Sequence, residues 1–137
     1  MQTDINKGNM HRIIVSDIFG RTSALEKIAE VLPGYVDIFD PYDSKYMGFS
    51  NEAEAYACFS SEVGLDTYAE KLSGIIAAQP KEIDLLGFSV GASAIWKISN
   101  QEESKNISSA LCFYGSQIRD YIDITPKFPV RLIFPSS

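Results

Sequence analysis

The sequence predicts a three-layer α/β/α domain with a mostly parallel five-stranded sheet in the strand order 2-1-3-4-5. Three observations support this prediction. Short apolar segments alternate with segments of helical periodicity, which is the pattern of βαβ units. Glycine and proline residues separate these segments and mark their ends. A G-x-S-x-G pentapeptide stands between an apolar segment and a helical one, as in a sharp strand-to-helix turn.

In the first half of the chain, the pattern predicts two strands and three helices. The first helix has a capping box formed by Ser23 and Glu26, in which each side chain satisfies a free backbone donor. Apolar positions then repeat at helical spacing until Pro33-Gly34 stops the helix. The expected strands are residues 12–19 and 35–39, and the expected helices are residues 25–32, 53–59 and 65–79.

In the second half, the pattern predicts three more strands and one longer helix. The strands are expected at residues 83–86, 109–114 and 130–134, and the helix at residues 92–99. Residues 101–106 are expected to be a polar loop, and residues 117–122 one helical turn. In the order 2-1-3-4-5, the direction in which successive strands are added to the sheet reverses between the first and third strands. Open parallel sheets bind ligands at such a switch point, at the carboxyl ends of the strands. We therefore expect residues 17–20 and 87–91 to converge at one site.

Length, composition and charge limit the classes of function. The 137 residues, of which 45% are apolar, suit one domain with a real core. We expect residues 1–9 to be a polar, disordered leader and residues 10–137 to form the domain. The net charge of −6 argues against nucleic acid, because phosphates attract Lys and Arg. No apolar run approaches the roughly 20 residues of a membrane span. We therefore expect a small-molecule partner, and a homodimer remains open.

The cysteines and the histidine argue against a metal site. Cys58 and Cys112 do not form a C-x-x-C pair, and His11 is the single histidine. Zinc is improbable with one histidine and two scattered cysteines, so we expect no metal. We expect no organic cofactor either. Reduced cysteines are typical of cytoplasmic proteins, and the cytoplasm is the predicted location.

The pentapeptide Gly87-Phe88-Ser89-Val90-Gly91 is the segment most indicative of chemistry. A nucleophilic serine on a strand-to-helix turn needs small neighbours, because the turn strains its backbone. The helix that follows directs free N–H groups and a positive dipole at the same place. The alternative interpretation is a plain tight turn in which the serine caps the helix.

Three segments together resemble the dienelactone hydrolase family of α/β-hydrolases, over residues 12–136. One is a strand end with an acid followed by Ile-Phe-Gly, and the second is a Gly-aromatic-nucleophile-x-Gly-small elbow. The third is a strand end of the form aromatic-Tyr-Gly. In this chain the three segments are Asp17-Ile18-Phe19-Gly20, Gly87-Phe88-Ser89-Val90-Gly91-Ala92 and Phe113-Tyr114-Gly115.

This resemblance implies roles for individual residues. Ser89 would be the nucleophile, where dienelactone hydrolase itself has cysteine, and the backbone N–H groups of Ile18 and Val90 would form the oxyanion hole. Asp17 stands where the family has an acid, usually glutamate, although it is equally well interpreted as a polar strand end. Arg21 and Arg119 would either hold a substrate carboxylate or be solvated. The remaining substrate-binding residues would be Phe19, Phe88 and Tyr114.

A base for Ser89 is missing from the sequence pattern. The family places its histidine and acid after the strand that corresponds here to residues 130–134, and this chain ends at Ser137. His11 precedes Ile18 by seven residues, about 23 Å along an extended strand, so we expect it far from Ser89. The first hypothesis is a C-terminally truncated serine hydrolase of a small ester, lactone or thioester. The alternatives are a non-catalytic small-molecule binding domain on the same fold and a flavodoxin-like ligand binder.

Overall fold

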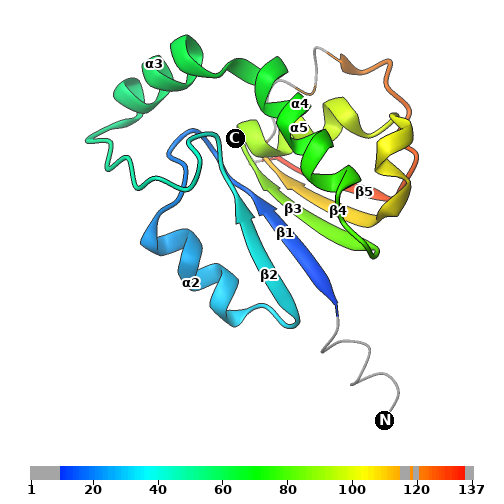
Figure 1. Ribbon diagram of the computed structural model, residues 1–137. Coiled ribbons are helices and arrows are strands. Elements are labelled where there is room, and N and C mark those ends of the chain that lie inside the picture. The colour runs from blue at the N-terminus through cyan, green and yellow to red at the C-terminus, as the bar shows by residue number, and fades with distance from the viewer. Residues whose placement is uncertain (1–9, 115–117, 119–120, 135–137) are drawn as a thin grey trace.

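The computed structural model describes residues 10–114, 118 and 121–134 (Figure 1). Its five strands form one parallel sheet in the order β2-β1-β3-β4-β5. This order and the flanking helices confirm the predicted α/β fold class. The strands are β1 (His11–Val15), β2 (Tyr35–Phe39), β3 (Ile83–Phe88), β4 (Ile107–Phe113) and β5 (Val130–Ile133).

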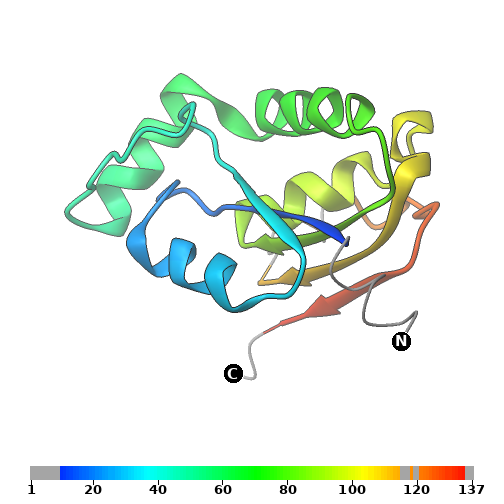
Figure 2. The same ribbon diagram turned by 60° about the horizontal axis from the view of Figure 1, so that its bottom comes forward.

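Helices lie on both faces of the sheet, as Figure 2 shows. Helices α4 and α5 cover one face, and α2 covers the other face beside β1 and β2. Helix α3 extends beyond the carboxyl ends of β1 and β2 (Figure 1). The helices are α2 (Ser23–Val31), α3 (Glu52–Glu62), α4 (Gly64–Ala77) and α5 (Val90–Ile98), with a 3-10 helix at Glu102–Asn106.

The core lies between the sheet and the α4–α5 layer. Alternate residues of the central strands point into this layer, so Ile13 and Val15 of β1 are 2% and 0% exposed. Leu72 and Ile76 of α4 are completely buried against the same layer, as is Ile95 of α5. Burial of such aliphatic side chains is the main favourable contribution to folding. It holds α5, and therefore the residue that precedes it, in a fixed place on the sheet.

Three local predictions differ from the structure. Strand β1 ends at Val15 rather than at residue 19, because the Asp17 carboxylate accepts the N–H of Phe19 at 2.9 Å and turns the chain. Helix α2 is capped by Thr22, which accepts the N–H of Leu25, and not by Ser23. Residues 102–106 form a 3-10 helix instead of a loop. The predicted helical turn at residues 117–122 falls largely outside the described residues.

The start of α5 approaches β1 more closely than any side chain would allow. A Cβ atom at Gly91 would lie 2.1 Å from the carbonyl oxygen of Val15 and 2.6 Å from that of Ser16. Both clashing atoms are backbone, so no rotamer change can relieve them. Glycine at this position therefore lets the α5 N-terminus contact the carboxyl end of β1.

Within the described residues, none of the helices is long and apolar enough to cross a bilayer.

We expect Gly91→Ala to lower the free energy of unfolding by about 3 kcal/mol or more, because the added methyl group has no space. Gly74→Ala is the matched control. Gly74 is exposed within α4, and no atom lies within 4 Å of its added Cβ. This control should stabilise by about 0.5–1 kcal/mol. Urea unfolding of both variants measures the difference, and equal effects would contradict the close approach.

Candidate active site

Ser89 lies on a strained turn between β3 and α5. Its backbone has φ 54° and ψ −115°, a conformation that L-residues other than glycine rarely adopt. The Ser89 side chain is exposed and does not cap α5, which argues against the plain capped turn. The turn is held by the Ser89 N–H, which donates to the Phe113 carbonyl at 2.7 Å, and by the Ser93 N–H, which donates to the Ser89 carbonyl at 3.1 Å.

The small residues around Ser89 are required by space. A Cβ atom at Gly87 would lie 2.6 Å from the Ile95 side chain and 2.8 Å from the backbone nitrogen of Ala92. Together with Gly91, this explains both glycines of the pentapeptide in steric terms. We call this sharp strand-to-helix turn the elbow: Ser89 has a positive φ, is exposed at the end of β3 and directly precedes the N-terminus of α5.

The segment after β1 forms the facing side of the site. The Gly20 N–H donates to the Asp17 carbonyl at 3.1 Å, which closes a turn around Ile18 and Phe19. Tyr42, which is 8% exposed, donates its hydroxyl to the Ile18 carbonyl. Tyr42 also packs edge-on against Phe49, with ring centroids 5.6 Å apart. Tyr42, packed against Phe49, therefore supports the turn that contains Ile18.

Ser89 lines two cavities of different character. The first cavity has a volume of about 360 Å³ and a mostly apolar lining. The second has a volume of about 330 Å³ and a lining that is polar and apolar in similar parts. The first is lined by Asp17, Phe19, Gly20, Thr22, Ala24, Leu25, Ile28, Phe88, Ser89 and Tyr114. The second is lined by Ile18, Glu52, Tyr56, Phe59, Ser60, Gly64, Ser89, Val90 and Ser93.

Most of the site residues expected from the sequence meet at Ser89. Asp17, Phe19, Phe88 and Tyr114 line the first cavity, where Phe88 stacks on Phe113 with ring centroids 5.5 Å apart. The two expected oxyanion-hole residues, Ile18 and Val90, line the second cavity. A carbonyl oxygen held by their N–H groups would therefore lie on the side of the second cavity.

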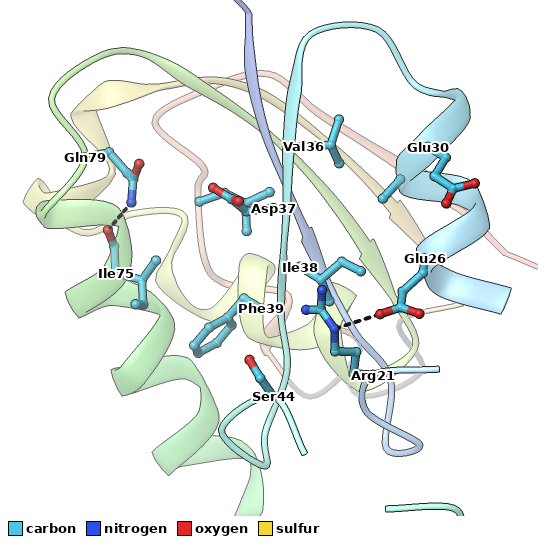
Figure 3. Close-up of a pocket in the computed structure, with 12 residues that line it drawn as sticks. Arg21, Glu26, Glu30, Val36, Asp37, Ile38, Phe39, Ser44, Ile75 and Gln79 are labelled. Atoms are coloured by element: carbon cyan, nitrogen blue, oxygen red, sulfur yellow. Dashed lines mark hydrogen bonds and ion pairs between the residues drawn. The ribbon is translucent and has the colours of Figure 1, made fainter. Parts of the chain in front are cut away.

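Of the two expected arginines, Arg21 does not join this cluster. Arg21 lines a separate groove of about 730 Å³ over the edge strand β2 (Figure 3). Its guanidinium donates to Glu26 at 3.0 Å, and Glu26 also accepts the Tyr46 hydroxyl. Hydrogen bonding with Tyr46, and then with Glu26, raises the pKa of Arg21, and hydrogen bonding with Tyr46, and then with Arg21, lowers the pKa of Glu26. The structure gives Arg21 a partner other than a substrate, and Arg119 lies outside the described residues.

His11 lies at the opposite end of the sheet from Ser89. It is the first residue of β1, and its Nε2 is 2.8 Å from the Asp37 carboxylate on the neighbouring strand. Ser89 follows the carboxyl end of β3, which runs parallel to β1. The expectation that His11 is not the base of Ser89 agrees with this placement.

Burial shifts the acid–base behaviour of Asp17. Desolvation raises the pKa of its carboxyl above the ordinary value of 3.8, and the nearby Glu52 carboxylate raises it further. The hydrogen bond from the Phe19 N–H acts in the opposite direction. Because burial dominates, the charged form of Asp17 is disfavoured in the folded protein.

Sequence reasoning missed the residues that α3 brings to Ser89. Glu52, Tyr56 and Ser60 lie on one face of this helix and line the second cavity. No motif marks them, because their role follows from where α3 packs and not from their spacing. Ser93 was also missed, although it lies one helical turn beyond Ser89 on α5. Within the described residues, no three His, Cys, Asp or Glu side chains gather to hold a metal ion.

Comparison with known proteins gives one relative of note. The chain is 32% identical over 130 residues to the uncharacterized protein YczH of Bacillus subtilis (strain 168). This match covers 90% of the chain and 62% of YczH, so the chain spans less than two thirds of that relative's length. No family model matches the chain. The resemblance to dienelactone hydrolases therefore stays a prediction.

We expect Ser89→Gly to be more stable than Ser89→Ala by about 1 kcal/mol. Both variants lose the hydroxyl, but only alanine keeps the Cβ atom that makes φ 54° unfavourable. Urea unfolding of the two variants isolates the backbone strain at the elbow. Equal stabilities would mean that Ser89 is not strained.

We expect Asp17→Asn to stabilise the protein at neutral pH and to lose that advantage in acid. The folded-state pKa of Asp17 is raised above 3.8, so ionisation destabilises the wild type as the pH rises through this range. Below 3.8 the carboxyl is protonated in both states and the penalty disappears. Unfolding free energies measured across this range test the sign, and an advantage that grows in acid would contradict it.

Proposed function

We propose that this chain provides the nucleophile and the oxyanion hole of a serine hydrolase that acts on a small ester, lactone or thioester. The observation that supports this most directly is the elbow itself. Ser89 has a positive φ, an exposed hydroxyl and no capping role. Strain of this kind persists only when the surrounding structure enforces it, and it clusters at functional sites. The similarity of three segments to dienelactone hydrolases points the same way.

The proposed reaction uses groups whose positions are described above. The Ser89 Oγ attacks the substrate carbonyl carbon, and its proton passes to a base and then to the leaving group. Water hydrolyses the resulting acyl-enzyme, which releases the acid and restores the hydroxyl. The N–H groups of Ile18 and Val90 hold the oxyanion, and such a donor typically contributes about 3–4 kcal/mol to transition-state stabilisation.

This proposal requires a base from outside residues 1–137. A serine hydroxyl is a weak nucleophile without an adjacent base, and the single histidine, His11, lies at the far end of β1. A histidine and an acid from another segment or another chain would have to reach Ser89. No metal or organic cofactor takes part in the proposed reaction. The free cysteines Cys58 and Cys112 support a reducing, cytoplasmic location.

The second candidate is a non-catalytic small-molecule binding domain on the same fold. The observation that favours it is the placement of His11, which leaves the described residues around Ser89 without an imidazole. The two cavities and the N-terminus of α5 could still bind a small carbonyl compound or anion.

Labelling by a fluorophosphonate distinguishes the two functions. We expect the protein made from its native gene to gain one phosphonyl adduct, and Ser89→Ala to gain none, because only an activated serine reacts readily. Ser61→Ala is the matched control, since Ser61 is an exposed serine of α3 that lines neither cavity, and it should label normally. Intact mass spectrometry reads the result. A native-gene product of 137 residues that remains unlabelled would favour the binding domain.

A further inference from the structure

The charges around Ser89 are of one sign. Each of its two cavities contains one carboxylate, Asp17 in the first and Glu52 in the second. None of the described residues that line either cavity is Lys, Arg or His. The arginine expected to hold a substrate carboxylate, Arg21, pairs with Glu26 in a different groove (Figure 3). A substrate carboxylate at Ser89 would therefore meet repulsion and find no partner among these residues.

The second cavity also contains an unsatisfied polar group. The hydroxyl of Ser93 has no hydrogen-bond partner within the described part of the chain, and the residue is only 1% exposed. A buried polar group without a partner is unfavourable, and native structures contain few of them. Because Ser93 lines this cavity beside Ser89, a polar group of a ligand bound there is the partner that we infer for its hydroxyl.

The first cavity offers the opposite chemistry. Its lining includes Phe19, Leu25 and Ile28 and the aromatic residues Phe88 and Tyr114. Apart from Asp17, the larger side chains here are apolar or aromatic. Such walls favour the part of a ligand that gains most from leaving water.

We propose that the Ser89 site binds acyl compounds with an apolar acyl group in the first cavity and a polar arm, neutral or cationic, in the second. The arm lies against Glu52, Ser60 and Ser93, and the site rejects an anionic arm. The inference deepens the proposed function and rests on it in taking Ser89 as the point where the carbonyl is held.

The test uses three stable amides that share a butanoyl group and differ in the charge of the arm. They are butanoyl-ethylenediamine, which is cationic, butanoyl-ethanolamine, which is neutral, and butanoyl-glycine, which is anionic. We expect calorimetric titration of the native-gene protein to show the cationic amide binding about tenfold more tightly than the anionic one. Exposed charge pairs contribute up to about 1 kcal/mol, or about fivefold each, and attraction and repulsion both act here.

Glu52→Gln should reduce this cation-to-anion ratio by about fivefold, because it removes the carboxylate of the second cavity. Glu54→Gln is the matched control. Glu54 lies in the same first turn of α3 as Glu52 but lines neither cavity, so both variants lose the same favourable contact with the helix dipole. The control should keep the wild-type ratio.

Ser93→Ala tests whether the Ser93 hydroxyl bonds the ligand, because a serine with a purely structural role would change stability and not affinity. The variant should bind butanoyl-ethanolamine about threefold or more weakly while its stability stays equal or rises, because it removes an unsatisfied buried hydroxyl. Unchanged affinity would remove Ser93 from the site.

The inference is overturned if butanoyl-glycine binds as tightly as the cationic amide, if Glu52→Gln leaves the ratio unchanged, or if none of the amides binds. These outcomes are separable from the proposed function, because amide binding does not need a reactive serine. Fluorophosphonate labelling without charge discrimination would overturn this inference alone. Charge discrimination without labelling would overturn the hydrolase and leave the binding site standing.

Discussion

The site depends on the backbone contact between the start of α5 and the end of β1. Any side chain at position 91 would lie within 2.1 Å of the Val15 carbonyl, so the two elements meet only because this residue is glycine. The contact sets Val90 and its N–H group beside the turn that contains Ile18. Ser89, one residue before α5, has a strained backbone conformation beside this contact. Ser89 and residues of the turn after β1 line the same two cavities.

Two buried tyrosines bond the carbonyl groups of the segment that follows β1, which faces the start of α5. The Tyr68 hydroxyl from α4 donates to the Ser16 carbonyl at 2.9 Å, while its ring stacks on Phe39 with centroids 5.3 Å apart. Tyr42 donates to the Ile18 carbonyl. Burial raises the pKa of both phenols, so both remain hydrogen-bond donors at physiological pH. The turn after β1 is thereby tied to β2 and to α4, and its carbonyl groups do not depend on solvent.

The backbone geometry at Ser89 supports the expected acyl transfer, whereas the charges around Ser89 do not support the expected acidic substrates. Acyl transfer requires an exposed nucleophile and nearby donors for the oxyanion, and the strained, exposed Ser89 shares a cavity with Ile18 and Val90. The acidic substrates implied by the resemblance to dienelactone hydrolases would need a cation, yet the described cavity walls contain carboxylates and no basic side chain. The substrate class at Ser89 is therefore better inferred from the cavities than from the resemblance. The relative YczH extends beyond the part that this chain matches.

The sequence alone determined the strand order, the elbow and the convergence of residues 17–20 with residues 87–91. The positions of the strands and the elbow follow from local periodicity and from glycines at fixed offsets, which act over a few residues. The strand order follows from the alternation of strands and helices and the right-handed connections of βαβ units. Only the tertiary structure decided that α3 brings Glu52 to Ser89, that Arg21 turns away to Glu26, and that Ser93 lacks a partner. The physical reason is that a side chain's partner depends on how distant elements pack, and that packing leaves no periodic signal in the sequence.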